Sequence, residues 1–176
     1  MIIGSKITLR DKRLADALDD YTWQTDPELA HLDAAPLPTI TFQEYLSDYT
    51  SQLRYLPSTR RQFAIDTLDG KHIGNCVYYG VNETNKGEAE LGIMIGNRDC
   101  WDKGYGADAV TTLVSYIFHQ TNLKRIYLKT LDSNNRAHKC FQKCGFTSSG
   151  HLVRDGFSFV LMEILRKQWE KQQTKT

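Results

Sequence analysis

Two glycines one residue apart separate a predicted strand from a predicted helix, and this junction constrains the fold more than any other stretch. The segment NRDCWDKGYGADAV, residues 97–110, follows the alternating run EAELGIMI. Apolar residues spaced i, i+3, i+4 and i+7 from Val110 predict an amphipathic helix over 105–120. Free N–H groups and the positive end of the dipole let a helix N-terminus bind an anion. The stretch therefore fits a phosphate-binding loop, with Arg98 and Lys103 adding charge, or a turn that only begins a helix.

The better-known glycine motifs do not match this segment. A Walker loop needs Gly-Lys followed by Ser or Thr, and a dinucleotide fingerprint needs a third glycine where Ala109 stands. A Rossmann loop would also follow the first strand, whereas this one comes late in the chain. Both of these nucleotide-binding classes are excluded.

Periodicity along the chain predicts the order of the other elements. We expect a strand in SKITLRDKR, helices after Asp11, Asp26 and Thr41, a strand pair RRQFAIDT and KHIGNCVYYGV, a polar loop NETNKG, the strand EAELGIMI, the helix at 105–120, the strand KRIYLKTL, a helix in DSNNRAHKCFQKCGF, and closing strands at 146–152 and 157–164. Asp69-Gly70 and Asp155-Gly156 are typical of tight turns. An antiparallel run followed by one βαβ crossover indicates an α+β domain with a mixed sheet. We expect one domain over 1–168 and a charged tail over 169–176, helical or frayed.

Composition narrows the classes of partner. The 22 basic and 21 acidic residues leave a net charge of +1, which favours neither nucleic acid nor an anionic membrane. No apolar run approaches the roughly 20 residues of a membrane span, and the start MIIGSKITLRDKR does not resemble a signal peptide. We therefore expect a cytoplasmic protein with no nucleic-acid or membrane partner.

The four cysteines have neither zinc-site spacing nor the density of a disulfide scaffold. Cys140 and Cys144 lie four apart on a predicted helix and could hold a metal with a histidine. Buried, reduced thiols are the more ordinary state of cysteine. We expect no metal.

Two segments together, ELGIMIGNRDCWDKGYGADA and DSNNRAHKCFQKCGF, resemble the GNAT acetyltransferase superfamily. More narrowly, the chain is similar to the branch that includes the ribosomal-protein N-terminal acetyltransferases. TWQTDPELA near the start and RKQWE near the end extend the resemblance over most of the chain. It implies a mixed, mainly antiparallel central sheet flanked by helices, with acetyl-coenzyme A bound where EAELGIMI and KRIYLKTL splay apart.

The resemblance also implies which residues contact acetyl-coenzyme A. Residues 93–95 would run beside the pantetheine arm, and the backbone of residues 103–107 would hold the pyrophosphate. Asn134 would contact the cofactor or its reacting end, although a helix cap is its structural alternative. The full implied set is Ile93, Met94, Ile95, Arg98, Trp101, Asp102, Lys103, Gly104, Tyr105, Gly106, Ala107, Asn134 and Phe141, with Asn134 and Glu90 as the catalytic candidates.

Acetyl transfer to an amine requires a group that accepts a proton, because a free amine with a pKa of about 10.4 is protonated at neutral pH. Glu90 is our first candidate and Glu88 the second, since both lie on one face of the strand before the glycine loop. Either could instead be a solvated residue or bond a neighbouring strand. Many relatives protonate the departing thiolate with a tyrosine where this chain has Phe141; Tyr105, Tyr127 and a water are alternatives that we leave open.

The acceptor amine is expected at the side built by the early helices and the last hairpin. Acidic residues there could attract a cation: Asp26, Glu28, Asp33, Glu44 and Asp48. His31 and His151 are candidates for the same mouth. The predicted function is acetyl transfer to a peptide or protein N-terminus or a small amine, with a non-catalytic acyl-coenzyme A binding module as the alternative. A homodimer is left open.

Overall fold

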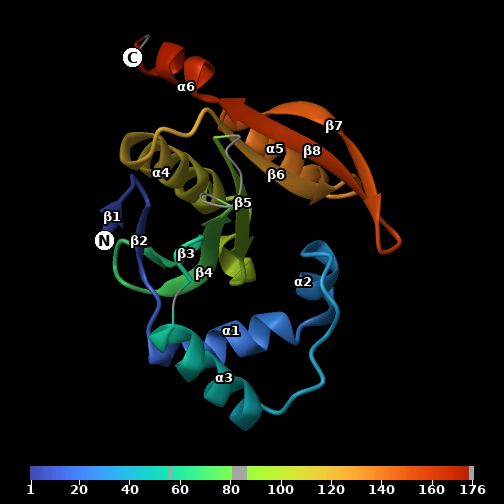
Figure 1. Cartoon of the computed structure of the whole chain (residues 1–176). Helices are drawn as coiled ribbons and strands as arrows, with labels where there is room; N and C mark the ends of the chain where they lie inside the picture. Colours follow the sequence, from blue (N-terminus) through green and yellow to red (C-terminus); the bar gives the residue numbers. More distant parts are fainter. Residues whose placement is uncertain (56, 81–86, 175–176) are drawn as a thin grey trace.

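The computed structural model describes residues 1–55, 57–80 and 87–174 (Figure 1). The strands are β1 (Ile2–Ile3), β2 (Ile7–Asp11), β3 (Arg60–Thr67), β4 (His72–Tyr79), β5 (Glu88–Ile95), β6 (Arg125–Leu131), β7 (Thr147–Arg154) and β8 (Phe157–Leu165). The helices are α1 (Ala17–Gln24), α2 (Pro27–Leu32), α3 (Phe42–Arg54), α4 (Tyr105–Gln120), α5 (Asn135–Lys143) and α6 (Arg166–Gln173), with 3₁₀ turns η1 (Leu14–Asp16) and η2 (Arg98–Cys100). The predicted order is confirmed, and β1 is an addition. Five residues of the predicted loop NETNKG, 82–86, lie outside the described ranges.

Local sequence signals fix the starts of the early helices. The Asp26 side chain accepts hydrogen bonds from the N–H groups of Glu28 and Leu29, both at 3.0 Å. Thr41 and Glu44 form the expected reciprocal capping box at the start of α3. These caps satisfy backbone donors that have no partner inside the helix.

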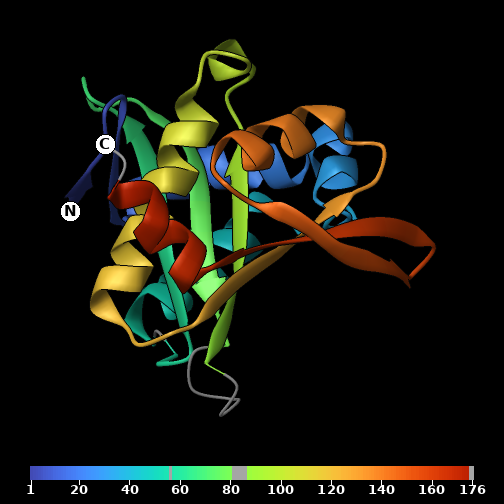
Figure 2. The same ribbon diagram turned by 90° about the horizontal axis from the view of Figure 1, so that it is seen from above.

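The strands within the described residues form one sheet in the order β1-β2-β3-β4-β5-β6-β8-β7. β5 and β6 are its parallel pair, and their register covers only Glu88 to Glu90 against Arg125 to Tyr127. β6 continues to pair with β8 as far as Leu131, so the later halves of β5 and β6 diverge. Figure 2 shows β7 and β8 extending away from the rest of the sheet as a hairpin. The predicted splaying of these two strands is therefore present.

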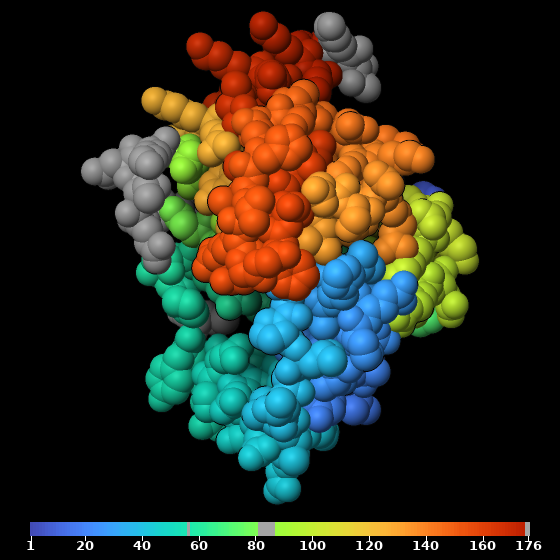
Figure 3. Space-filling model, turned by 90° about the vertical axis from the view of Figure 1, so that its right-hand side faces the viewer, coloured from blue at the N-terminus to red at the C-terminus, as the bar shows by residue number. Residues whose placement is uncertain are grey.

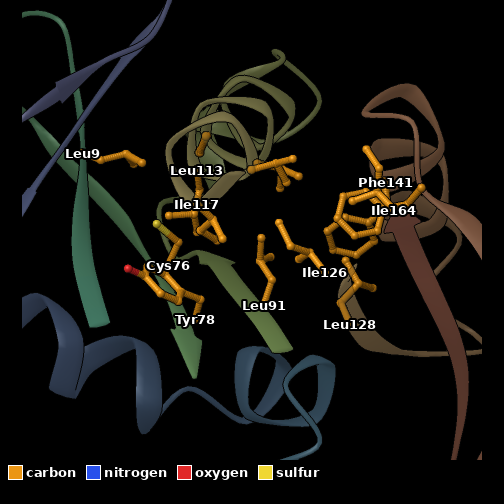
Figure 4. Packing of buried hydrophobic residues seen from close by; sticks show 14 of the residues in the cluster. Leu9, Cys76, Tyr78, Leu91, Leu113, Ile117, Ile126, Leu128, Phe141 and Ile164 are labelled. Atoms are coloured by element: carbon orange, nitrogen blue, oxygen red, sulfur yellow. The ribbon is translucent and has the colours of Figure 1, made fainter. Parts of the chain in front are cut away.

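The core lies between the sheet and α4 (Figure 4). Leu113 and Ile117 of α4 are fully buried, and Tyr116 packs edge-on against Phe63 of β3 with ring centroids 5.8 Å apart. The other face of the sheet meets α1, where Asn75 of β4 donates to Asp20 at 2.6 Å. This layering leaves the later half of β5, with the first half of β4 beside it, as the floor between α1, α2 and α5.

The predicted domain boundary at residue 168 falls inside α6. Trp169 of this helix is buried, and its ring centroid lies 5.3 Å from that of Phe118. The charged tail is thus packed on the domain at its start; residues 175 and 176 lie outside the described ranges. Every helix in the described part of the chain falls short of the length and apolarity that a bilayer crossing requires.

Candidate active site

A cavity of about 510 Å³ opens where β5 and β6 diverge, between the glycine loop, α2 and α5. It is lined by Leu29, Leu32, Asp33, Ile93, Met94, Ile95, Cys100, Trp101, Asp102, Gly104, Gly106, Ala107, Asn134, Arg136, Ala137, Lys139, Cys140, Phe141 and Lys143. We call it the first cavity. Ten of the residues that the resemblance implied lie in this lining, so the fold brings the strand end, the loop and α5 together as expected.

The two glycines of the opening motif have different structural roles. Gly104 is the N-cap of α4 and has φ +85°, a conformation that disfavours residues with a side chain. Gly106 is the second residue of α4. A Cβ added there would lie 3.6 Å from Ile95 Cγ1 and 3.7 Å from Cys140 Sγ. Gly104 therefore shapes the loop, and Gly106 keeps the cavity open beside the first N–H groups of α4.

Several contacts hold this loop in place. The Asp108 carboxylate accepts hydrogen bonds from the N–H groups of Ser5 (3.1 Å), Lys6 (2.8 Å) and Ile7 (3.1 Å). Lys6 Nζ donates to the carbonyl of Lys103 at 3.1 Å. The N-terminal segment is thereby tied to the first turn of α4, and these hydrogen bonds hold the beginning of the helix in place.

Trp101 is the second fixed point of the loop. Its indole N–H donates to the Ile95 carbonyl at 2.7 Å, and the Arg136 guanidinium lies 3.4 Å from the ring centroid. A guanidinium stacked on an indole is a favourable cation–π contact. This pair joins the end of β5 to α5 across the first cavity.

Three cations of α5 line the first cavity: Arg136, Lys139 and Lys143. Sequence reasoning did not single them out. Their i, i+3, i+7 spacing on a predicted helix was the available signal, because residues at that spacing share one face. They supply the positive charge that an anionic ligand needs.

Three other predicted cofactor residues do not line the first cavity. The Arg98 side chain is held by Asp26 at 2.8 Å and Glu28 at 2.7 Å, and these ion pairs tie the loop to α2. Figure 3 shows the corresponding contact between the yellow-green loop and the blue α2 region. The Lys103 side chain is exposed, and Tyr105 packs against the core. Arg98 is therefore a structural tether here, since its charge is already matched.

Glu90 is positioned by its own strand pairs. It lies in register with Tyr79 on one side and Tyr127 on the other, is only 9% exposed, and forms an ion pair with Lys129 at 3.0 Å. Burial, with this carboxylate nearby, raises the pKa of both tyrosines. Glu90 is absent from the lining of the first cavity, and Glu88 is bound by Arg125 at 2.9 Å.

Asn134 and Phe141 both line the first cavity. Asn134 lines the first cavity and also caps α5, its side-chain oxygen accepting from the N–H of Ala137 at 3.2 Å. Phe141 is 7% exposed and packs against Phe146 with ring centroids 6.0 Å apart. Both expected roles of Asn134 are compatible with this placement.

A second cavity of about 340 Å³ adjoins the first. It is lined by Asp20, Trp23, Gln24, Ala30, Asp33, Ala35, Pro36, Pro38, Arg60, Gln62, Asn75, Cys76, Val77, Gly92, Ile93 and Met94. Asp33, Ile93 and Met94 line both cavities, so the two spaces meet at the end of β5. His31 of α2 stacks near Phe157 of the closing hairpin, with ring centroids 6.0 Å apart, and helps to close this side.

Asp33 is the titratable group at the junction. Water reaches its side chain, but the carboxyl lies in the concave wall that the two cavities share. Partial desolvation by the surrounding protein raises the pKa of Asp33 to about 6. In the sequence, Asp33 is one of several acids expected on the acceptor side, and nothing in its neighbourhood distinguishes it from the others.

Cavity-lining Asp20 is neutralised by its neighbours. Its carboxylate forms an ion pair with Lys12 Nζ at 2.6 Å. It also accepts hydrogen bonds from the Tyr49 hydroxyl at 3.0 Å and the Asn75 amide at 2.6 Å. Desolvation lowers the pKa of Lys12, which sits in this buried group.

Among the described residues, no group of three or more metal-ligating side chains occurs, and all four cysteines are free.

Comparison with known proteins identifies the relatives of this architecture. Residues 6–147 match the family model described as acetyltransferase (GNAT) domain. An uncharacterized N-acetyltransferase p20 from Bacillus licheniformis is 28% identical over 85% of this chain and 83% of its own length. An aminoglycoside N(6')-acetyltransferase type 1 from Klebsiella pneumoniae is 26% identical over 82% of this chain and 69% of its own.

Solved structures agree on the fold. The spermidine N-acetyltransferase of Vibrio cholerae, in complex with coenzyme A and spermine, superposes with a TM-score of 0.82 at 22% identity, over 95% of this chain and 99% of that one. The relatives with named substrates are aminoglycoside and spermidine acetyltransferases, so the narrower resemblance to the ribosomal-protein branch is not supported. The family match covers most of the chain and includes the β5 strand, the glycine loop and α5. The chain belongs to the GNAT acetyltransferase family.

Proposed function

We propose that the protein transfers the acetyl group of acetyl-coenzyme A to a small primary amine. The observation that carries this proposal is the meeting of two cavities at Ile93, Met94 and Asp33. A ternary reaction needs two separate binding spaces that share one short wall, where the thioester and the amine come into contact. The end of β5 supplies that wall.

Acetyl-coenzyme A fits the first cavity. The N–H groups at the start of α4 would hold the pyrophosphate, with Gly106 allowing close approach. Arg136, Lys139 and Lys143 offer charge to the same anionic molecule. Residues 93–95 line the first cavity, and two of them, Ile93 and Met94, also line the second, so this segment would contact the pantetheine arm.

Asp33 is the proton acceptor that we propose in place of Glu90. It lines both cavities, whereas Glu90 is paired with Lys129 and lines neither. The ammonium form of the acceptor gives one proton to the Asp33 carboxylate. The neutral nitrogen then attacks the thioester carbonyl carbon, the C–N bond forms and the C–S bond breaks. The nitrogen gives its second proton to a water molecule, and the sulfur leaves as the thiolate.

The leaving group requires less help than an alkoxide would. The thiol of free cysteine has a pKa of about 8.5, far below that of an alcohol, so a thiolate is the better leaving group of the two. Phe141 cannot donate a proton, and neither Tyr105 nor Tyr127 lines a cavity. We therefore propose that the thiolate leaves without a side-chain acid and takes its proton from water.

The relatives favour a small amine over a protein N-terminus. The aminoglycoside and spermidine acetyltransferases are named for small amine substrates. A second cavity of about 340 Å³ is at the lower end of the volume range of small-molecule sites, which supports the same choice.

Free-thiol release from acetyl-coenzyme A in the presence of a panel of amines and N-terminal peptides tests this function. We expect turnover with small amines and weaker turnover with peptides. Calorimetry with coenzyme A is the matched binding measurement. Tight binding of coenzyme A with no turnover on any acceptor would support the non-catalytic module instead.

A further inference from the structure

We propose that the acceptor is a small zwitterion, an amine that also carries a carboxylate or phosphate, and that Arg60 binds its anionic group while Asp33 faces its amine. This inference rests on the proposed function and deepens it by naming the substrate class. Both side chains line the second cavity. Neither group was assigned a role by the sequence motifs of the family.

Most of the acids named here from the early helices are matched by the protein itself. Asp20 is bound by Lys12, Tyr49 and Asn75, and Asp26 and Glu28 are bound by Arg98. Glu44 is used as a helix cap by Thr41. Asp33 alone among these acids lines the cavity without an ion pair to any described residue.

Arg60 brings a permanent positive charge to the lining of the second cavity. It begins β3, on the strand face that also presents Gln62 to the cavity, and donates to Gln62 Oε1 at 3.3 Å. Within the part of the chain that the structure describes, its guanidinium has no carboxylate partner. Arginine stays charged at any physiological pH and offers a planar fork to a carboxylate or phosphate.

The nearest strand neighbours do not neutralise Arg60. It is in register with Tyr79 of β4, which is in register with Glu90 of β5. Glu90 is already paired with Lys129 at 3.0 Å. One unmatched carboxylate and one unmatched guanidinium therefore share a small cavity, and a ligand with one charge of each sign complements both.

The second cavity should bind a polycation less well than a zwitterion. An extended polyamine offers several ammonium groups, and each would need a carboxylate or a carbonyl partner. Here a second ammonium group would meet Arg60, and like charges at short range disfavour binding. We infer that this chain differs in acceptor class from the spermidine and aminoglycoside acetyltransferases that it resembles.

The test compares acceptors that differ only in the anionic group. Initial rates are measured with several amino acids, the corresponding amino-acid amides, short aminoalkyl phosphates and spermidine. We expect kcat/KM for the free acids or the phosphates to exceed that for the amides and spermidine by about 10-fold to 100-fold, as one charge-assisted bidentate contact allows. The free-acid and phosphate arms distinguish the two anions.

Arg60→Gln and Arg61→Gln form a matched pair of variants. Arg61 is the next residue of β3 and lies on the opposite face, over Phe63 and Tyr116 of the core side. Arg60→Gln should remove the preference for the anionic acceptor through a higher KM, and Arg61→Gln should keep it. Calorimetry of free acid and amide with the protein saturated in coenzyme A should show the same loss, independently of turnover.

The possible outcomes separate the two proposals. Preference for spermidine or the amides, or an Arg60→Gln variant that keeps the full preference in rate and binding, overturns the zwitterion and leaves the acetyltransferase function intact. No turnover on any amine, with Arg60-dependent binding of the free acid retained, overturns the function and supports the zwitterion site. If the wild-type protein shows neither turnover on any amine nor binding of the free acid, both proposals are overturned.

Discussion

The indole of Trp23 occupies the space that a side chain at Gly96 would need. A Cβ added to Gly96 would lie 2.0 Å from Trp23 Cδ2, well inside van der Waals contact. Trp23 belongs to α1 and lines the second cavity, while Gly96 directly follows β5. This contact fixes the distance between the early helices and the strand end where the two cavities meet.

Gly96→Ala should therefore displace Trp23 and disturb the acceptor side selectively. We expect a loss of about 1–3 kcal/mol in the free energy of unfolding, typical of overpacking in a close-packed site. KM for the amine should rise more than KM for acetyl-coenzyme A, because Trp23 lines only the second cavity. Denaturant unfolding and steady-state kinetics measure the two effects.

Gly150→Ala is the control for that variant. A Cβ there would stand 3.7 Å from Leu161 Cδ1, an ordinary contact distance. Stability and both KM values should stay near those of the wild type. Equal losses in the two variants would contradict the role assigned to the Trp23 contact.

Gly106→Val should weaken the binding of acetyl-coenzyme A. The added methyl groups would extend past a Cβ that already lies 3.6 Å from Ile95 and 3.7 Å from Cys140, and so into the first cavity. Filling that space should raise Kd by about 5-fold to 150-fold, the equivalent of an overpacking cost of about 1–3 kcal/mol. Calorimetry with coenzyme A measures the change.

Gly104→Ala tests the effect of backbone conformation in the loop without filling the cavity. A Cβ there has no close neighbour apart from the flexible end of Lys6 at 3.8 Å, but φ +85° strains any residue with a side chain. We expect Gly104→Ala to lower the free energy of unfolding by about 1–2 kcal/mol, and therefore to lower Tm, as its main effect. An unchanged Kd in Gly106→Val would remove the pyrophosphate assignment.

Lys139→Gln and Lys143→Gln should both raise KM for acetyl-coenzyme A and leave KM for the amine unchanged. Both residues line the first cavity and neither lines the second. Because they act on an anionic ligand through exposed charges, their effect should shrink as salt rises and the Debye length falls toward about 3 Å at 1 M. A charge effect that salt does not reduce would contradict this account.

Much of the fold was predictable because its signals are local. The capping pairs Asp26 with Pro27 and Thr41 with Glu44, and the period of α4, each depend on neighbouring residues. The family was predictable for a different reason, since two separate motifs resembled it. What the sequence could not supply was long-range pairing of charges.

The side-chain roles of Arg98, Glu90 and Asp33 illustrate that limit. Arg98 looks like a phosphate ligand in sequence, but Asp26 and Glu28, about seventy residues earlier, hold it in ion pairs. Glu90 looks like a base, but Lys129 of another strand pairs with it. Asp33 follows α2 in a sequence that carries no functional motif. Only the folded chain, in which α2 and the end of β5 line the same cavity, places this residue between two cavities.

Asp33→Asn should lower activity and raise stability at neutral pH. Removing a general base typically reduces the rate by about 10²-fold to 10⁴-fold. In the wild-type protein, kcat/KM should rise with pH through an apparent pKa of about 6, since the carboxylate form accepts the proton. That step should be absent from the residual activity of the variant.

The effect on stability has a defined sign. The pKa of Asp33 is raised from about 3.9 in an unfolded chain to about 6 in the folded protein, so the associated stability is present below about pH 4 and is lost as pH rises through 6. Asparagine does not ionise and avoids that loss. The variant should therefore have a higher Tm than the wild type at pH 7.5, and the difference should disappear near pH 4.

Asp48→Asn is the matched control, because Asp48 is an exposed acid of α3 that lines neither cavity. It should change neither the pH profile nor the pH dependence of Tm. If Asp33→Asn keeps the step near pH 6, the proton acceptor is another group. In that case the same measurements on Glu90→Gln decide whether the buried carboxylate reaches the amine through water despite its ion pair with Lys129.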